Sequence, residues 1–324
     1  KRVVVHGNNK TPQELREAIE AGVGCIVVDS RIELGRISAI AVTYGVLGIP
    51  VCIWILAKGK TFYNKEYWKF CVVLAIPAVF YNLSDLILGQ SDKVMLQQMM
   101  DEATVGCYGA ALNFGGIMFT LFTALNNSWC PFFFEDMKQG NRENLREKAG
   151  NFLELFTVLS VGFVLLASEV YRYVYVSRDF WGSTMLIPIF VSSYYTNFLC
   201  TFPVNFEYYH KKTKVVSIIT IVSSLINVGL NYLLILRIGM AGAAVATLIS
   251  HSLQLTLHYL YVRFALGGKE YPFPLKMWVG YAAVFAAVAV ASVAADGLWL
   301  ARWGLGAAIG LWELLRIRKR KVLI

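Results

Sequence analysis

The stretch KFCVVLAIPAVFYNLSDLILGQSDKVMLQQMMD, residues 69–101, decides the fold. Its apolar run predicts a membrane-spanning helix over 69–90, because a helix needs about 20 residues at 1.5 Å rise to cross roughly 30 Å of hydrocarbon. Two features interrupt this run, Pro77 in the middle and Asp85 near the end. The polar residues 90–93 predict the end of the span, and the methionine-rich residues after them predict an amphipathic tail.

The composition of the whole chain agrees with this interpretation. Hydrophobic residues make up 57% of the 324 residues, charged residues make up 16%, and the mean hydropathy is +0.54. Soluble domains carry more charge and fewer apolar residues, so the composition predicts an all-α polytopic membrane protein. The net charge of +9 does not indicate nucleic-acid binding, because the basic residues lie in short clusters between apolar runs instead of on one face.

Nine apolar stretches are long enough to span a bilayer. They cover residues 37–57, 69–90, 103–129, 149–170, 184–206, 214–236, 240–264, 277–295 and 297–315. The last two are joined at Asp296 and Gly297, so they predict a tight hairpin.

The charges between these stretches predict an orientation. Alternate loops and the C-terminal tail carry 19 Lys and Arg residues, and the opposite loops carry four. Cytoplasmic loops are enriched in Lys and Arg, so the C-terminus is expected to be cytoplasmic in a multi-pass protein of the inner (plasma) membrane. The first span then runs inward, which leaves residues 1–35 outside with no signal sequence to carry them there. We therefore expect further helices to precede this part of the natural protein.

The first 35 residues have a different pattern. Two short β-branched runs, 3–5 and 25–28, flank a helix start at Thr11, Pro12 and Glu14, which predicts a β-α-β unit. The segment VVVHGNNKTPQELREAIEAGVGCIVVDS resembles diaminopimelate decarboxylase, a pyridoxal-phosphate enzyme built on a barrel. One such unit cannot close a barrel sheet, and the motifs of that family for the cofactor lysine and the phosphate are absent. We therefore expect no enzyme activity, no cofactor and no role for Lys10 in a Schiff base.

The six cysteines form no C-x-x-C pair and are interpreted as small buried hydrophobes, neither a disulfide framework nor a metal site. The sequence also shows no catalytic triad, Walker motif or phosphate-binding glycine loop, so neither catalysis nor ATP-driven transport is expected.

From about residue 37 onward the chain resembles a polysaccharide-biosynthesis flippase of the MOP exporter superfamily. The segments that carry the resemblance are Tyr81–Ser84, Gly89–Leu96, Gly106–Ala111, Asn126–Phe132, Asn205–Lys214, Asn227–Tyr232 and Gly242–Thr247. The resemblance implies two lobes with a substrate cleft between them that opens alternately to each side. Residues 36–264 would be the last helix of the first lobe and a six-helix second lobe, and residues 265–324 an extra hairpin with a basic tail.

The resemblance also implies a function. The expected substrate is a polyprenyl-pyrophosphate-linked oligosaccharide, moved across the lipid bilayer with H⁺ or Na⁺ as a possible coupling ion, and the expected partners are a polysaccharide polymerase and glycosyltransferases. The alternative is a cation-coupled small-molecule exporter like the MATE pumps. The substrate-cleft candidates are Asp85, Lys93, Asn113, Asn126, Asn127, Asn205, Glu207 and His251.

Several of these polar residues also have a structural interpretation. Asp85 could pair with a buried polar group, and Asp92 with Lys93 could mark a helix cap or a packing contact at the outer end of the helix. Asn126, Asn127 and Ser128 could simply close the third helix before Pro131.

Other polar residues are expected to be structural. Asn227 and Asn231, four residues apart, favour hydrogen bonding between helices, and His251, Gln254 and His258 form one stripe that is either a packing seam or a proton path. Charged side chains near helix ends are expected to reach water by snorkelling; these are Glu154, Glu169, Glu207 and Arg302. Small residues four apart, Gly239, Gly242, Ala243 and Ala246, predict close helix packing.

Overall fold

The computed structural model describes residues 4–5, 25–26, 46, 48–51, 53–54, 57–59, 64–175, 177–266, 270–294 and 297–320. The chain divides into two compact units, Lys1–Val73 and Leu74–Ile324. In the first unit, β1 (Val4–Val5) pairs in parallel with β2 (Cys25–Ile26). A parallel pair is the arrangement that a β-α-β unit requires, but the helix predicted between the strands lies outside the described residues. The described positions between 46 and 59 are all helical.

Long helices make up the rest of the chain. They are α3 (Lys65–Met99), α4 (Glu102–Gln139), α5 (Arg142–Val174), α6 (Leu186–Tyr209), α7 (Thr213–Ile238), α8 (Met240–Phe264), α9 (Leu275–Ala294) and α10 (Trp299–Arg320), with a 3-10 helix η1 (Arg178–Ser183) before α6. Each predicted stretch from 69 to 315 overlaps one of these helices. The prediction of a helical membrane protein is therefore confirmed.

The number of spans is confirmed only in part. Among the described helices, α4, α5, α7, α8 and α9 are long and apolar enough to cross a membrane. Helix α6 is rich in Ser, Thr, Tyr and Asn, and its buried residues lie on all sides of the helix because it packs against α4, α5, α7, α8 and α9. A helix enclosed by protein can carry polar residues, since neighbouring helices satisfy them. The total of nine spans stays a prediction.

Two predicted helix ends are wrong. Helix α3 does not end at the polar residues 90–93 but continues to Met99, because Asp92 and Leu96 are buried on one face of the same helix. Helix α4 does not end at Asn126–Ser128 but continues through Pro131 to Gln139. Trp129 and Phe133 lie one turn apart and are buried, so this extension is held by packing.

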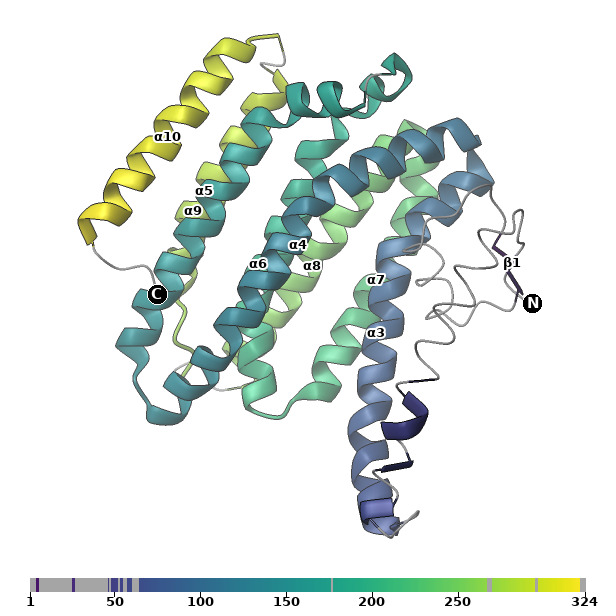
Figure 1. Cartoon of the computed structure of the whole chain (residues 1–324), viewed down its shortest axis with the longest axis vertical. Coiled ribbons are helices and arrows are strands. Elements are labelled where there is room, and N and C mark those ends of the chain that lie inside the picture. The colour runs from purple at the N-terminus through teal and green to yellow at the C-terminus, as the bar shows by residue number, and fades with distance from the viewer. Residues whose placement is uncertain are drawn as a thin grey trace. The chain divides into compact units, whose positions relative to one another are not determined.

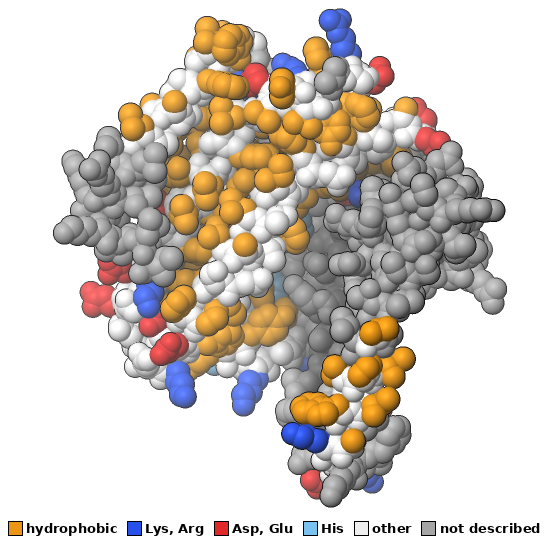
Figure 2. All heavy atoms as spheres, in the orientation of Figure 1, with side chains coloured by type: hydrophobic (Ala, Val, Ile, Leu, Met, Phe, Trp, Pro, Cys, Tyr) orange, Lys and Arg blue, Asp and Glu red, His pale blue; other side chains and the backbone are white. Residues whose placement is uncertain are grey.

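Successive helices of the second unit run antiparallel (Figure 1). The connections at 140–141, at 210–212 and at 265–274 therefore lie at the same end of the unit, together with the C-terminal end of α10. Figure 2 shows hydrophobic side chains over the middle of the visible face, and Lys, Arg, Asp and Glu toward its two ends. This is the arrangement expected of helices that cross a bilayer.

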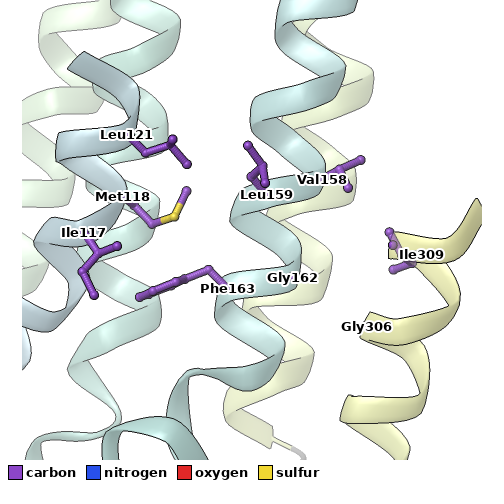
Figure 3. A pocket seen from close by; sticks show the side chains of 10 residues that line it. Ile117, Met118, Leu121, Val158, Leu159, Gly162, Phe163, Gly306 and Ile309 are labelled. Carbon is purple, nitrogen blue, oxygen red and sulfur yellow. The ribbon is translucent and has the colours of Figure 1, made fainter. Parts of the chain in front are cut away.

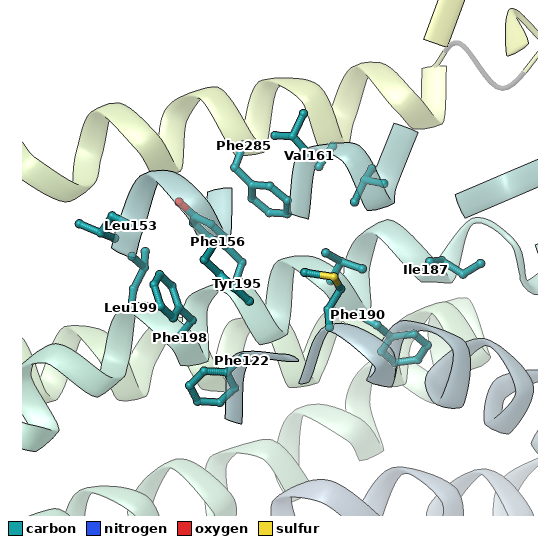
Figure 4. Close-up of a cluster of buried hydrophobic side chains, with 14 of the residues drawn as sticks. Phe122, Leu153, Phe156, Val161, Ile187, Phe190, Tyr195, Phe198, Leu199 and Phe285 are labelled. Carbon is teal, nitrogen blue, oxygen red and sulfur yellow. The ribbon is translucent and has the colours of Figure 1, made fainter. Parts of the chain in front are cut away.

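The core of the second unit is aromatic. In Figure 4, α5, α6 and α9 point Phe156, Phe198, Tyr195 and Phe285 toward one another, with Phe122 of α4 beside them. The ring centroids of Phe156 and Phe198 lie 4.2 Å apart, and those of Tyr195 and Phe285 lie 4.3 Å apart. Since lipid tails are as apolar as these rings, close packing rather than the hydrophobic effect holds such helices together.

Helices α7 and α8 approach each other so closely at Gly242 that a side chain at this position would clash with the backbone of α7. Gly239, at a φ of 61°, ends α7 and begins α8, so the two helices meet without a loop. A Cβ atom on Gly242 would lie 2.3 Å from the carbonyl oxygen of Leu234. The predicted close packing of the small residues in this segment is therefore confirmed for Gly242, and Ala243 and Ala246 beside it are fully buried.

Candidate functional site

A buried carboxylate lies where α3, α4, α7 and α8 meet. Asp92 of α3 is 2% exposed, and its two oxygens accept hydrogen bonds from three helices. Tyr108 Oη of α4 donates at 2.5 Å, Asn231 Nδ2 of α7 at 2.6 Å and Thr247 Oγ1 of α8 at 2.7 Å. The carboxylate therefore joins four helices through short hydrogen bonds from neutral donors.

Further amide and hydroxyl groups form hydrogen bonds with these donors. Asn227 Oδ1 accepts hydrogen bonds from Ser91 Oγ at 3.0 Å and from Asn231 Nδ2 at 3.1 Å. Asn227 Nδ2 reaches Thr247 Oγ1 at 3.5 Å. The side-chain oxygen of Asn231 is buried and has no hydrogen-bond donor. This unused acceptor lies in the residue that also donates to the Asp92 carboxylate.

The charge of Asp92 is not balanced by a basic side chain. The charged and polar groups that act on it within the described chain are Tyr108, Thr247, Asn231 and Ser91. The next residue, Lys93, points elsewhere on the helix because consecutive helical residues lie about 100° apart. Burying a charge without an ion-pair partner is costly, and the three short hydrogen bonds offset part of that cost, so a proton or a bound cation would further stabilise the buried carboxylate.

The ligand chemistry fits a hard cation. Carboxylate, amide and hydroxyl oxygens are the ligands that hard cations take in proteins. One carboxylate supplies one negative charge, so a single proton or a monovalent ion such as Na⁺ would make the site neutral. In the part of the chain that the structure describes, no group of three or more His, Cys, Asp and Glu could hold a metal ion. The oxygen ligands and the single charge of the Asp92 site therefore suit H⁺ or Na⁺.

The structure does not gather the predicted cleft residues into one site. Asp85 lies in α3, but its side chain is outside the described residues. Lys93 is half-buried, and Asn113 and Asn127 lie on exposed positions of α4. Asn126 and Asn205 do meet, since Asn205 Nδ2 reaches Asn126 Oδ1 at 3.4 Å between α4 and α6.

The remaining two predicted residues lie elsewhere. His251 of α8 is buried, and its Nδ1 has no hydrogen-bond partner. Glu207 of α6 is expected to snorkel, but it is fully buried. Its Oε1 atom forms a hydrogen bond with His258 Nδ1 at 2.9 Å. That expectation is wrong because α6 is enclosed by other helices, so the carboxylate has no path to water along its own helix.

Asp92 and its partners were not predicted as a site. The interpretation of Asp92 as a helix cap is wrong, because α3 continues for seven residues beyond it, whereas the packing role is confirmed. The predicted hydrogen bonding of Asn227 and Asn231 between helices is confirmed. A pair of asparagines one turn apart, together with an aspartate in another span, is the signal that could have indicated the site.

Arg302 and Glu169 also differ from their predictions. Arg302 of α10 is only 4% exposed, and it forms an ion pair with Glu169 of α5. Trp303 Nε1 donates to the other carboxylate oxygen of Glu169 at 3.2 Å. Neither charge snorkels alone, because the two meet between helices and neutralise each other. This ion pair attaches the C-terminal hairpin to α5.

An apolar groove lies apart from these polar groups. It has a volume of about 360 Å³ and is formed by α4, α5 and α10. Figure 3 shows Met118 and Leu121 of α4, Leu159 and Phe163 of α5 and Ile309 of α10 around it. The groove is also lined by Gly162, Gly306 and Gly310, which have no side chains to fill it. The groove suits a hydrocarbon chain and offers no polar group to a sugar or phosphate.

Comparison with known proteins supports the class of protein. Over 176 residues the chain is 25% identical to an uncharacterized membrane protein of Haemophilus influenzae, and the match covers 53% of this chain and 43% of that protein. Over 46 residues it is 50% identical to diaminopimelate decarboxylase of Mycobacterium leprae and 52% identical to that of Mycobacterium tuberculosis, a match to 14% of this chain and 10% of each enzyme.

The chain therefore spans less than half the length of the membrane relative and about a tenth of the decarboxylases. No family model matches the chain. No solved structure matches it either. The apolar helices and the similarity to a membrane protein together define a multi-pass membrane protein.

Proposed function

We propose that this chain forms the second lobe of a flippase that moves a polyprenyl-pyrophosphate-linked oligosaccharide across the plasma membrane, with its C-terminus in the cytoplasm. The observation that carries the proposal is the Asp92 site. A buried ionisable residue inside a membrane protein is costly to keep and commonly marks an ion or proton site. The resemblance of residues 37–324 to polysaccharide flippases supplies the substrate class.

In this proposal Asp92 couples transport to a cation. Without a cation the carboxylate is charged and destabilises the packed arrangement of α3, α4, α7 and α8. Binding of H⁺ or Na⁺ makes the site neutral and favours the packed arrangement. A cation gradient can therefore shift the lobe between two conformations, because the ion binds one conformation better than the other.

The apolar groove favours a lipid-linked substrate over a small drug-like molecule. A polyprenyl chain could lie against Gly162, Gly306 and Gly310 while its polar headgroup crosses between lobes. The alternative, a cation-coupled exporter of small molecules, shares the Asp92 site but has no need for this groove. Association with a polymerase and glycosyltransferases belongs to the same proposal.

The test is an Asp92→Asn variant in the native host. The change removes the charge but keeps the size of the side chain, so the protein should fold while lipid-linked oligosaccharide accumulates on the cytoplasmic leaflet. Glu143→Gln, on an exposed position of α5, is the matched control and should export normally. Normal export by Asp92→Asn would remove the coupling role. Changed drug sensitivity with unchanged glycan export would favour the small-molecule exporter.

A further inference from the structure

A second buried acid lies about three helical turns further along α8 than the Asp92 site, on the same face of the helix. Glu207 of α6 and His258 of α8 are both fully buried, and Glu207 Oε1 lies 2.9 Å from His258 Nδ1. His258 follows Thr247, the α8 residue of the Asp92 site, by eleven residues. At 1.5 Å per residue the two sites are roughly 16 Å apart along the helix.

The Glu207–His258 pair has free hydrogen-bonding capacity. Among the described residues, Glu207 Oε2, His258 Nε2 and Tyr271 Oη are buried atoms without a hydrogen-bond partner. Cys200 of α6 and Tyr271 interact electrostatically with Glu207 and are neutral groups. Glu207 and His258 are therefore an acid and a base that share a proton with each other in the packed lobe.

Among the described residues at this end of the unit, the other charged groups lie away from Glu207. His210, at the end of α6, faces Glu270 at 3.9 Å. Lys211 and Lys212, between α6 and α7, and Lys214, in the first turn of α7, are exposed. His258 is the only ion-pair partner that the described residues give to Glu207.

Burial decides how many protons the pair holds. With no shared proton, neutral histidine and ionised glutamate carry a net charge of −1. With one shared proton the pair is neutral, whether the proton lies on Oε1 or on Nδ1, and with two it carries +1. Buried sites disfavour net charge, so the packed lobe favours one shared proton. In water, free glutamate and histidine side chains titrate near pH values of about 4.3 and 6.5, so a hydrated pair at pH 7.5 would hold no shared proton.

A polar seam connects this pair with the Asp92 site. Along one face of α8, His251 and Gln254 lie between Thr247 and His258, and all four are buried. Gln254 Nε2 donates to Thr220 Oγ1 of α7 at 3.2 Å. His251 Nδ1, Ser193 Oγ of α6 and Ser223 Oγ of α7 have no hydrogen-bond partner. These groups can bind water or pass a proton along the seam.

We propose that Glu207 and His258 form a second proton-binding site, distinct from Asp92, which holds one proton while the lobe is packed. Resting on the proposed function, we further propose that water reaches the pair when the lobe opens. The proton shared by Oε1 and Nδ1 then moves to water, and the pair changes from neutral to −1. The ligand of this site is a proton and requires no metal.

The test is a ¹⁵N spectrum of the full chain labelled only at its four histidines. We expect one imidazole with a strongly hydrogen-bonded Nδ1 and the same signals at pH 6 and pH 8. His258→Gln should remove these signals, while His210→Gln and His251→Gln should leave them. Glu207→Gln should shift them to those of a neutral imidazole.

Loss of the shared proton between pH 6 and pH 8, or a spectrum of His258 that Glu207→Gln does not change, would overturn the proposed site. If Glu207→Gln does not fold, the wild-type spectra at the two pH values with the three histidine variants still decide the question. The measurement does not depend on transport. An unchanged ¹⁵N signature together with normal glycan export in the Asp92→Asn host would reject the coupling role of Asp92 but keep this site.

Discussion

At the scale of single residues, three acids that lie between the helices have three different kinds of partner. Asp92 has only neutral donors, Glu207 has a histidine, and Glu169 has an arginine. An arginine always carries its charge, so the Arg302–Glu169 pair is permanent. A carboxylate with neutral donors or with a histidine can change its charge when a proton or cation binds. The first two are therefore functional candidates, and the third is structural.

The Arg302–Glu169 pair makes an asymmetric prediction about stability. Glu169→Gln leaves the Arg302 guanidinium buried without its carboxylate, which should cost roughly 3–5 kcal/mol. Arg302→Met should cost less, because Glu169 is partly exposed and can reach water. Thermal unfolding in detergent measures both variants. Equal effects of the two changes would contradict the assignment, and the double variant Glu169→Gln with Arg302→Met should recover most of the loss.

At the scale of elements, α7 and α8 together hold most of the Asp92 site. Asn227 and Asn231 come from α7, and Thr247 comes from α8. The helices meet at Gly239 without a loop, so the site depends on how closely they pack. Small residues at this contact thus determine the distances at the carboxylate.

Gly242→Ala tests that contact. The new Cβ would lie 2.3 Å from the carbonyl oxygen of Leu234, so α7 and α8 must separate. Overpacking of this kind costs about 1–3 kcal/mol, and the separation should also weaken the hydrogen bonds from Asn231 and Thr247 to Asp92. Gly229→Ala in α7 is the control, since nothing lies within 4 Å of its added Cβ. The two variants should differ in their unfolding temperature, and equal temperatures would contradict the close approach.

The start of α4 should respond to pH. Asp101 caps this helix by accepting a hydrogen bond from Thr104 N at 2.6 Å, and the backbone hydrogen bond holds the pKa of Asp101 below its usual value. A lowered pKa means that the cap stabilises the helix above the ordinary pKa of aspartate and loses this effect as the pH falls through the lowered value. The protection of the Thr104 amide from hydrogen exchange, relative to the intrinsic rate at each pH, should therefore fall at acid pH.

Two substitutions distinguish the capping hydrogen bond of Asp101 from the effect of its charge. Asp101→Asn should keep a slow exchange rate at Thr104 with little dependence on pH beyond the intrinsic one, because asparagine also caps helices. Asp101→Ala should exchange rapidly at all pH values. An Asp101→Ala variant as well protected as the native protein would show that the cap does not hold this helix start.

At the scale of the whole molecule, loop charge predicts which ends of the helices lie inside. The antiparallel succession of α4–α10 puts the connections at 140–141 and 210–212 at one end of the second unit. The helix ends and loops around these two connections carry seven of the 19 Lys and Arg residues on this side: Lys138, Arg142, Arg146, Lys148, Lys211, Lys212 and Lys214. The prediction of which helix ends are cytoplasmic thus depends on the loop charges, and the antiparallel order of the helices comes from the structure.

Cysteine labelling in cells tests this orientation. A membrane-impermeant thiol reagent should label a cysteine introduced at Ser177 but not one introduced at Asn141, since the two lie at opposite ends of α5. Both should react after permeabilisation. The native cysteines supply the background to subtract, and the opposite labelling pattern would reverse the predicted orientation.

The sequence by itself determined the helices and the class of membrane protein, because hydropathy and helix length are local properties of the chain. Even the close packing near Gly242 was evident from small residues four apart. Helix ends were less accurate at residues 90–93 and 126–131, since packing rather than polarity decided where α3 and α4 end.

Only the tertiary structure decided which polar residues meet. The hydrogen-bond partners of Asp92 lie 16, 139 and 155 residues away along the chain, and those of Glu207 and Arg302 are also distant. No local pattern reveals such contacts. A polar residue in a span can snorkel, pair or bind an ion, and the choice depends on which side chain a neighbouring helix presents at the same depth.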